Sequence, residues 1–238
     1  YTPGKGKLRA VAKGVRKPGS RLRPLIEPGR LVEVEFGLDP QRDLQFLRGG
    51  SVQLDPMSLE PTLEKSAFLL GALELVDRCR PLGTGQDHLD ISQLYEICGA
   101  YLRMLSSTTC RAPALLFFAF EWELLTRHGM APEIDSCISC GTGLADLALS
   151  ALWFSPGEGG LVCDDCSRQG IAGKKPLGSA ALKILRQLAE CGLDQDLAAP
   201  LPRPLRREVG AALHQFLGYH LPGYRLPAAL DLLRNRPA

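Results

Sequence analysis

The chain has 238 residues, 45% of them hydrophobic and 23% charged, a composition typical of a soluble globular protein with one large or two ordinary domains. The longest nearly apolar run, residues 112–120, is far too short to cross a bilayer, so no membrane span is expected. The net charge of +2 hides an asymmetry, because residues 1–30 contain nine Lys or Arg against the single acidic residue Glu27, whereas the rest of the chain is net acidic.

The basic N-terminal block begins with an alternating pattern. Leu8, Ala10 and Ala12 alternate with mostly basic residues, which predicts a half-buried strand with basic outward positions. Glycine and proline breaks in residues 14–19 then predict a basic loop. Such a block on an acidic body indicates a nucleic-acid surface, with a solubilising strand or a disordered arm as the alternative. Because Tyr1 is its only aromatic residue, we expect electrostatic, sequence-tolerant binding and little base stacking.

Further alternation in residues 30–36 and 44–54 indicates short strands of a small β-barrel or sandwich. From Met57 the hydrophobic period becomes helical. Helices are predicted for residues 61–80, 90–105, 115–128, 179–191, 205–221 and 228–233. One face of the first is predicted to carry Leu63, Ala67, Leu70, Leu73 and Val76.

The third predicted helix is apolar nearly all round, so we expect it at the centre of a helical bundle. Gly129 and Gly192 are expected to end the third and fourth helices, and Ser179 to cap the start of the fourth. Residues 82–88 and the basic stretch starting at Lys174 are expected to be linkers.

Two C-x-x-C pairs dominate the middle of the chain, Cys137 with Cys140 and Cys163 with Cys166. This spacing is typical of a closed four-thiolate metal site. Residues 149–162 between the pairs read as strand, turn and strand, which would bring the second pair back against the first. Zn²⁺ is the expected ion, because thiolates are soft ligands. Four thiolates leave no coordination position open for a water molecule, so the predicted zinc is structural and not catalytic.

Other roles for these cysteines remain open. Two disulfides, a redox-active pair or iron in a four-sulfur site are the alternatives to zinc. The remaining cysteines are scattered, and at least the first three are expected in or near the core: Cys79, Cys98, Cys110 and Cys191. The histidines lack a spacing that suggests a metal or catalytic site, so all are interpreted as structural: His88, His128, His214 and His220. With no catalytic constellation in the sequence, we expect a protein that is not an enzyme.

Several stretches, in this order, resemble the bacterial recombination mediator family RecO over nearly the whole chain. They are Gly6-Lys7-Leu8-x-Ala10-Val11-Ala12-Lys13-Gly14-x-Arg16 with Ser20 and Leu22, Phe120-Glu121-x-x-Leu124-Leu125-x-x-x-Gly129-x-x-Pro132, the first C-x-x-C with Gly141, Phe154, Gly159-Gly160, the second C-x-x-C, and Tyr219-His220-Leu221.

The resemblance implies an α+β fold in three parts. Residues 1–56 would form an OB-like β-barrel lacking its first strand, a strand that family members carry before the position of Thr2. Residues 57–136 and 167–238 would form an α-helical domain, and residues 137–166 a zinc module inserted into it.

The resemblance also implies a non-enzymatic role in bacterial recombinational DNA repair. A family member binds single- and double-stranded DNA, anneals complementary strands, and acts with RecR to help load RecA onto DNA coated by single-strand-binding protein (SSB). The acidic C-terminal tail of SSB docks on the helical domain. This role, together with reduced thiols, predicts a cytoplasmic, nucleoid-associated protein.

Lys7, Lys13 and Arg16 match the family's DNA-facing strand and loop. Charge alone extends the predicted DNA-binding set by Lys5, Arg9, Lys17, Arg21 and Arg23. The alternative is a nucleic-acid-binding or transcription factor that reads DNA with its zinc ribbon. Asp164 and Asp165 argue against it, because phosphate would be repelled there.

Overall fold

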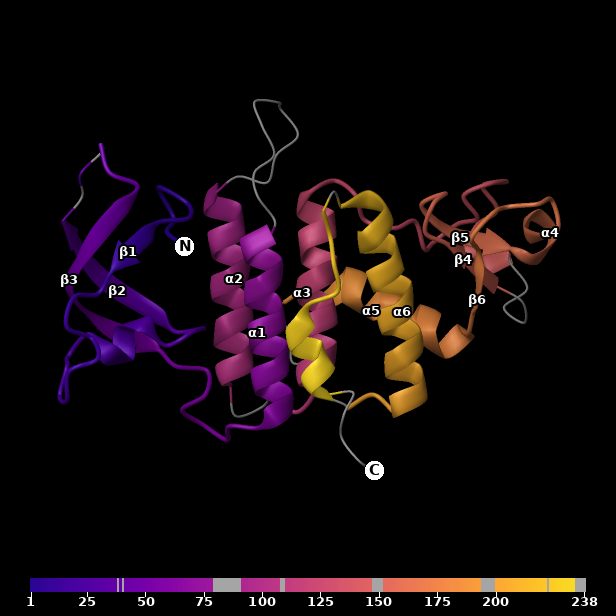
Figure 1. Ribbon diagram of the computed structural model, residues 1–238. Coiled ribbons are helices and arrows are strands. Elements are labelled where there is room, and N and C mark those ends of the chain that lie inside the picture. Colours follow the sequence, from indigo (N-terminus) through magenta and orange to yellow (C-terminus); the bar gives the residue numbers. More distant parts are fainter. Residues whose placement is uncertain are drawn as a thin grey trace. The chain divides into compact units, whose positions relative to one another are not determined.

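The computed structural model describes residues 1–37, 39, 41–78, 91–107, 110–146, 152–193, 200–221 and 223–233 (Figure 1). It confirms a mixed α+β class, with several helices and two small sheets among these residues. The predictions for Cys79, His88 and the linker at residues 82–88 lie outside the described residues. None of the helices in the described part of the chain is long and apolar enough to span a membrane.

The structure divides into two compact units. Unit 1 is Tyr1–Pro113 together with Pro227–Ala238, and unit 2 is Ala114–Leu226. This division differs from the predicted one, which separates residues 1–56 from a helical domain and a zinc module. The predicted domain boundaries stay a prediction.

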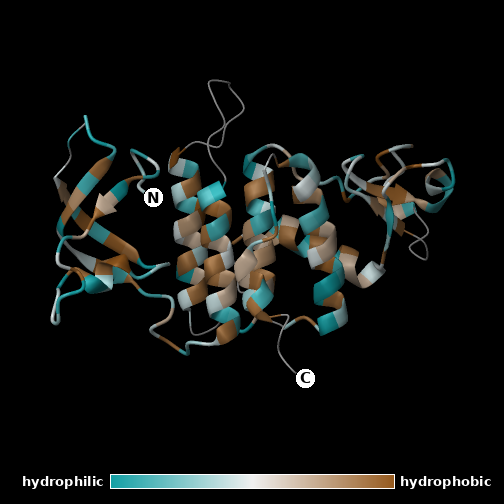
Figure 2. Cartoon of the chain, viewed as in Figure 1, coloured by the Kyte–Doolittle hydropathy of each residue, from teal (hydrophilic) through white to brown (hydrophobic). Residues whose placement is uncertain are grey.

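Unit 1 begins with a three-stranded sheet. Strand β3 (Leu44–Leu54) lies in the middle, antiparallel to β2 (Leu31–Gly37) and parallel to β1 (Arg9–Val11). Hydrophobic and hydrophilic residues alternate along these strands (Figure 2), as expected for a sheet with two different faces. In the described part of the chain the strands form an open sheet and no closed barrel, so the OB-like part of the fold prediction is not confirmed.

Gly49 and Gly50 lie inside β3 and do not end the strand. The register between β2 and β3 shifts by one residue between Glu35 and Phe36. On the Glu35 side of this shift, Gly50 pairs with Val34 of β2. A Cβ atom at Gly50 would lie 2.1 Å from the carbonyl oxygen of Glu33, so only glycine fits this close approach.

The predicted basic strand is wrong in extent and only partly right in burial. Strand β1 has three residues. Arg9 is exposed, and Leu8 and Ala12 are half-buried, as predicted, but Ala10 is exposed and Val11 is half-buried. The reason is non-local: the short segment pairs with β3 in parallel, which places Val11 opposite Phe46.

Three helical elements complete unit 1 beside the 3₁₀ turn Arg23–Ile26. Helix α1 (Leu63–Arg78) and helix α2 (Ile91–Ser106) are followed, at the other end of the chain, by the 3₁₀ helix η3 (Ala228–Leu233). The carboxylate of Glu74 on α1 accepts hydrogen bonds from the N–H groups of Ala228 and Ala229, both at 2.9 Å. The carboxylate thereby satisfies two donors that a helix start leaves open, and it ties the C-terminal segment to α1.

The predicted apolar face of α1 is only partly buried. Leu63 and Leu70 are exposed, and the buried residues of the helix are Lys65, Ala67, Phe68, Leu69, Gly71, Ala72 and Leu75. Since α1 carries apolar residues on several sides, its sequence period does not select one face, and tertiary packing makes the choice.

Unit 2 contains the predicted long helices. They are α3 (Pro113–Arg127), α5 (Ser179–Cys191) and α6 (Arg203–His220). Helix α3 is buried on nearly every side, as its sequence predicted. It carries one fully buried carboxylate, that of Glu121, whose Oε1 lies 3.2 Å from Nε2 of His214 on α6.

A second three-stranded sheet belongs to unit 2. Strand β4 (Leu152–Ser155) pairs antiparallel with β5 (Gly160–Cys163), which confirms the predicted hairpin, and also with β6 (Lys175–Leu177). The predicted linker at Lys174 is therefore wrong, because Lys175 and Pro176 form an edge strand. Pro176 is tolerated there since an edge strand leaves one side of its backbone unpaired.

The ends of α3 and α5 test three capping predictions. Gly129 (φ 67°) and Gly192 (φ 56°) end the helices as expected, since their left-handed backbone favours glycine. Ser179 does not cap α5: the N-cap is Gly178, whose N–H donates to the carboxylate of Glu208 at 2.6 Å.

Candidate metal centre and nucleic-acid surface

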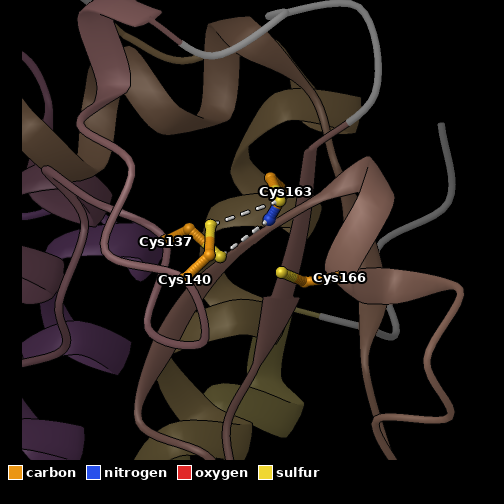
Figure 3. A group of neighbouring side chains, drawn as sticks. All are labelled: Cys137, Cys140, Cys163 and Cys166. Atoms are coloured by element: carbon orange, nitrogen blue, oxygen red, sulfur yellow. Dashed lines mark hydrogen bonds between the residues drawn. The ribbon is translucent and has the colours of Figure 1, made fainter.

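The first cysteine pair sits on a tight backbone turn. The N–H of Gly141 donates to the carbonyl oxygen of Cys137 at 2.8 Å, and the N–H of Cys137 donates to that of Thr142 at 2.9 Å. Gly141 adopts φ 74°, which glycine reaches without strain. The turn places the Cys137 and Cys140 side chains next to each other, as the C-x-x-C spacing predicted (Figure 3).

The second pair follows the β4–β5 hairpin. Cys163 is the last residue of β5, and Cys166 lies in the short helix α4 (Asp164–Ser167) directly after it. Backbone hydrogen bonds join the two pairs: the N–H of Leu161 donates to Glu133 at 2.8 Å, and that of Ile138 donates to Leu161 at 2.9 Å. The hairpin therefore brings the second pair back to the first, as the sequence predicted.

The turn of this hairpin is held by the end of α6. Nε2 of His220 donates to the carbonyl oxygen of Pro156 at 2.6 Å, and the His220 ring lies 4.2 Å from that of Phe216, centroid to centroid. The ring of Tyr219 covers Gly157, where an added Cβ would lie 3.1 Å from Cζ. His220 therefore has a structural contact, in line with the interpretation of the histidines as structural.

The four thiol groups lie close enough to hold one metal ion. The sulfur atoms of Cys137, Cys140, Cys163 and Cys166 are all within 4.8 Å of one another, and those of Cys140 and Cys163 are 3.9 Å apart (Figure 3). Four sulfurs each about 2.3 Å from one tetrahedral ion lie roughly 3.8 Å apart. A slight contraction of the cluster therefore gives the coordination geometry that a structural metal requires.

Of the four cysteines, one is exposed and three are buried. Cys140 is exposed, whereas Cys137, Cys163 and Cys166 are buried and pack with Ile138, Trp153 and Ile171. An apolar shell of this kind excludes water from most of the coordination sphere, so the arrangement suits an ion that fixes the chain.

The thiol pKa values diverge within the cluster. The hydroxyl and backbone N–H of Thr142 lower the pKa of Cys140 to about 6. The backbone N–H of Cys166 lowers the pKa of Cys163, but burial and the neighbouring sulfurs outweigh it and raise this pKa to about 12. Four such close thiols cannot all ionise together without a cation, and a dication would offset the repulsion among four thiolates.

The predicted DNA-binding residues all have exposed side chains. They are Lys5, Lys7, Arg9, Lys13, Arg16, Lys17, Arg21 and Arg23. Lys7 forms an ion pair with Asp77 of α1, and within the described residues it is the one member of this set seen to pair with an acid. Arg16 and Lys17 line a shallow pocket of about 500 Å³ together with Ala12, Gly14, Val15 and Pro18.

One aromatic residue near the basic block was missed by sequence reasoning. The ammonium nitrogen of Lys13 lies 4.5 Å from the ring centroid of Phe46, a cation–π contact. Phe46 follows Lys13 by 33 positions, and only the parallel pairing of β1 with β3 brings the two together. No local pattern in the sequence signals this contact.

Family models match almost the whole chain. The model described as "Recombination protein O N terminal" matches residues 1–53, and the one described as "Recombination protein O C terminal" matches residues 60–229.

Curated relatives match over a similar extent. A protein of Anaeromyxobacter dehalogenans (strain 2CP-C) is 34% identical over 227 residues, which cover 95% of this chain and 85% of the relative. A protein of Frankia casuarinae is 31% identical over 222 residues, covering 91% and 82%, and one of Chlorobium limicola is 27% identical over 197 residues, covering 81% and 73%. Each of the three is named "DNA repair protein RecO".

Proposed function

This chain belongs to the RecO family, and on that premise we propose that it is a non-catalytic DNA-binding protein of recombinational DNA repair. The observation that carries the proposal is the exposed basic block of the N-terminal segment. Seven of its eight predicted DNA-binding cations have no acidic partner among the described residues, so they are available to phosphate.

The proposed interface consists of Lys5, Lys7, Arg9, Lys13, Arg16, Lys17, Arg21 and Arg23. Binding releases cations condensed on DNA, so the affinity falls with salt by a log–log slope of about 0.7 per neutralised phosphate on single strands. Lys7 contributes less than the others in this scheme, because Asp77 already neutralises it.

Strand annealing follows from the same electrostatics. Cations that neutralise phosphates on two strands lower the repulsion between them, which allows complementary strands to pair without ATP. The family resemblance supports the partners: RecR, the acidic C-terminal tail of SSB, and indirectly RecA. It also supports an OB-like barrel around the N-terminal sheet, the three-part domain division, and action in the bacterial cytoplasm at the nucleoid.

We further propose that Cys137, Cys140, Cys163 and Cys166 hold a structural Zn²⁺. The donor set supports this identity, because four clustered thiolates favour zinc and leave no open position for a reacting water. The ion would fix the turn of the first pair to the end of β5. Asp164 and Asp165 beside the second pair support a role in holding the chain and disfavour DNA contact there.

Charge reversal at Lys13 and Arg16 together tests the interface. The double change to Glu should slow annealing of complementary oligonucleotides and reduce the salt slope of single-strand binding by about 1.4, the share of two phosphates. Lys183→Glu with Arg207→Glu is the matched control, since both residues are exposed cations on α5 and α6. Unchanged annealing rates of the Lys13/Arg16 variant at low and moderate salt would refute this interface.

A further inference from the structure

The pairing of β1 with β3 defines one face of the N-terminal sheet. Arg9 lies opposite Leu44, and Val11 lies opposite Phe46. Residues directly opposite each other project from the same side of a sheet, and successive residues project from opposite sides. Arg9, Val11, Leu44 and Phe46 therefore share one face. The other face carries Gln45 and Leu47, both buried.

The face that carries Phe46 is open to solvent and basic. Leu44 is 47% exposed, and Phe46 is half-buried. Lys13 places its ammonium group over the Phe46 ring. On the other side Gly37 pairs with Phe46, and a Cβ at Gly37 would lie 2.9 Å from a guanidinium nitrogen of Arg48. The missing side chain thus leaves room for the Arg48 guanidinium next to the aromatic ring.

Charge is divided along this face. Lys13 and Arg48 lie next to Phe46, and Arg9 lies on the same face opposite Leu44. None of the three forms an ion pair with a residue that the structure describes. Glu33 and Glu35, which alternate with Val34 and Phe36 on β2, share the side of Gly37 and are exposed. A polyanion is therefore attracted to the end of the face near β1 and repelled from the end of β2 that carries these acids.

We propose that Phe46 stacks on an unpaired nucleobase and gives this sheet a preference for single-stranded DNA. The inference rests on the proposed DNA binding and deepens it. Bases in a duplex stack on one another, so only an unpaired base can offer its face to a protein ring. Arg9, Lys13 and Arg48 contact the phosphates on either side of that base.

Lys13 couples the phosphate contact to the stacking of the base on Phe46. In the free protein its ammonium group covers the Phe46 ring, held by the ring's negative face. A phosphate is the stronger partner for an ammonium group, so a bound strand draws Lys13 off the ring and opens it to the base. Phosphate contact thus precedes stacking, and DNA of any sequence satisfies both.

The test compares Phe46→Leu with Phe36→Leu, a matched loss of a half-buried phenyl ring from the opposite face of the same sheet. Three fluorescent probes of equal length are used: an oligothymidine, a duplex, and an abasic strand that keeps phosphates but lacks bases. Phe46→Leu should weaken oligothymidine binding at least about fivefold. It should leave duplex binding, abasic-strand binding and the salt slope unchanged, whereas Phe36→Leu should alter none of the four.

A second variant keeps the test valid if Phe46→Leu destabilises the sheet. In Phe46→Trp the new indole retains the stacking surface, so its fluorescence should be quenched by oligothymidine and not by the abasic strand. Absence of that quenching overturns the inference, as does an equal loss of all three probes in a folded Phe46→Leu protein.

Failure of the inference and failure of the proposed function give different results. If Phe46→Leu binds oligothymidine normally while the Lys13/Arg16 charge reversal weakens it, base stacking is refuted and DNA binding stands. If the unaltered protein binds none of the three probes, both are refuted.

Discussion

Gly160→Ala tests how the two cysteine pairs are held together. A Cβ atom at Gly160 would lie 2.1 Å from the carbonyl oxygen of Glu133, and 2.9 Å from its carbonyl carbon and backbone nitrogen. The contacted atoms are backbone, so β5 and the Glu133 segment must separate. Two hydrogen bonds join them here, Leu161 N–H to Glu133 at 2.8 Å and Glu133 N–H to Gly159 at 3.0 Å.

The cost follows from these contacts. Each backbone hydrogen bond contributes about 0.5–1.5 kcal/mol net, and overpacking at a close contact costs about 1–3 kcal/mol. We therefore expect Gly160→Ala to lower the free energy of unfolding by about 2–6 kcal/mol. Zinc affinity should fall as well, because the separated segments carry Cys137 and Cys163 apart.

Urea denaturation and competition for zinc with a coloured chelator measure both effects. Gly143→Ala is the control, because Gly143 lies in the same region, has no atom within 4 Å of an added Cβ and lacks a left-handed backbone. A Gly160→Ala protein that matches the unaltered one in unfolding midpoint and zinc affinity would show that the Glu133–β5 contact does not position the cysteines.

Three further predictions concern the metal centre and unit 1. Cys140→Ala should remove bound zinc, as measured by elemental analysis. It should also lower the thermal unfolding midpoint, because metal binding contributes to folding. Lost DNA binding at an unchanged midpoint would contradict a structural ion. Zinc binding near neutral pH should release protons and strengthen as pH rises, because the Cys163 thiol, with its pKa of about 12, is protonated without metal. A pH indicator in unbuffered solution detects the released protons. A lack of proton release would contradict thiolate ligation. Glu74→Ala should lower the free energy of unfolding, measured with urea, by about 1–3 kcal/mol, because the hydrogen bonds to Ala228 and Ala229 are lost. Glu96→Ala, at an exposed position on α2, is the control. Equal stability of the two variants would show that Glu74 does not hold η3 on α1.

Local patterns predicted the parts of this molecule that local chemistry decides. The cysteine cluster was predictable because a C-x-x-C turn places two sulfurs together whatever surrounds it. The β4–β5 hairpin and the glycines that end α3 and α5 belong to the same class, since each depends on a few neighbouring residues.

The errors share a different cause, which is pairing between distant segments. Lys175 and Pro176 form an edge strand only because β4 lies beside them, and the N–H of Gly178 at the start of α5 finds its acceptor in Glu208, on α6. The Phe46–Lys13 contact likewise depends on a parallel pairing across more than 30 residues. Composition and period carry no information about such partners.

The discontinuity of unit 1 has a consequence for biosynthesis. Helix α1 emerges from the ribosome early, yet the segment that Glu74 fastens to it, η3, is translated only after all of unit 2. Unit 1 therefore cannot reach its finished state until unit 2 has been translated. A nascent chain stalled before Pro227 leaves the side of α1 that carries Glu74 uncovered, at a stage when unit 2 is already complete.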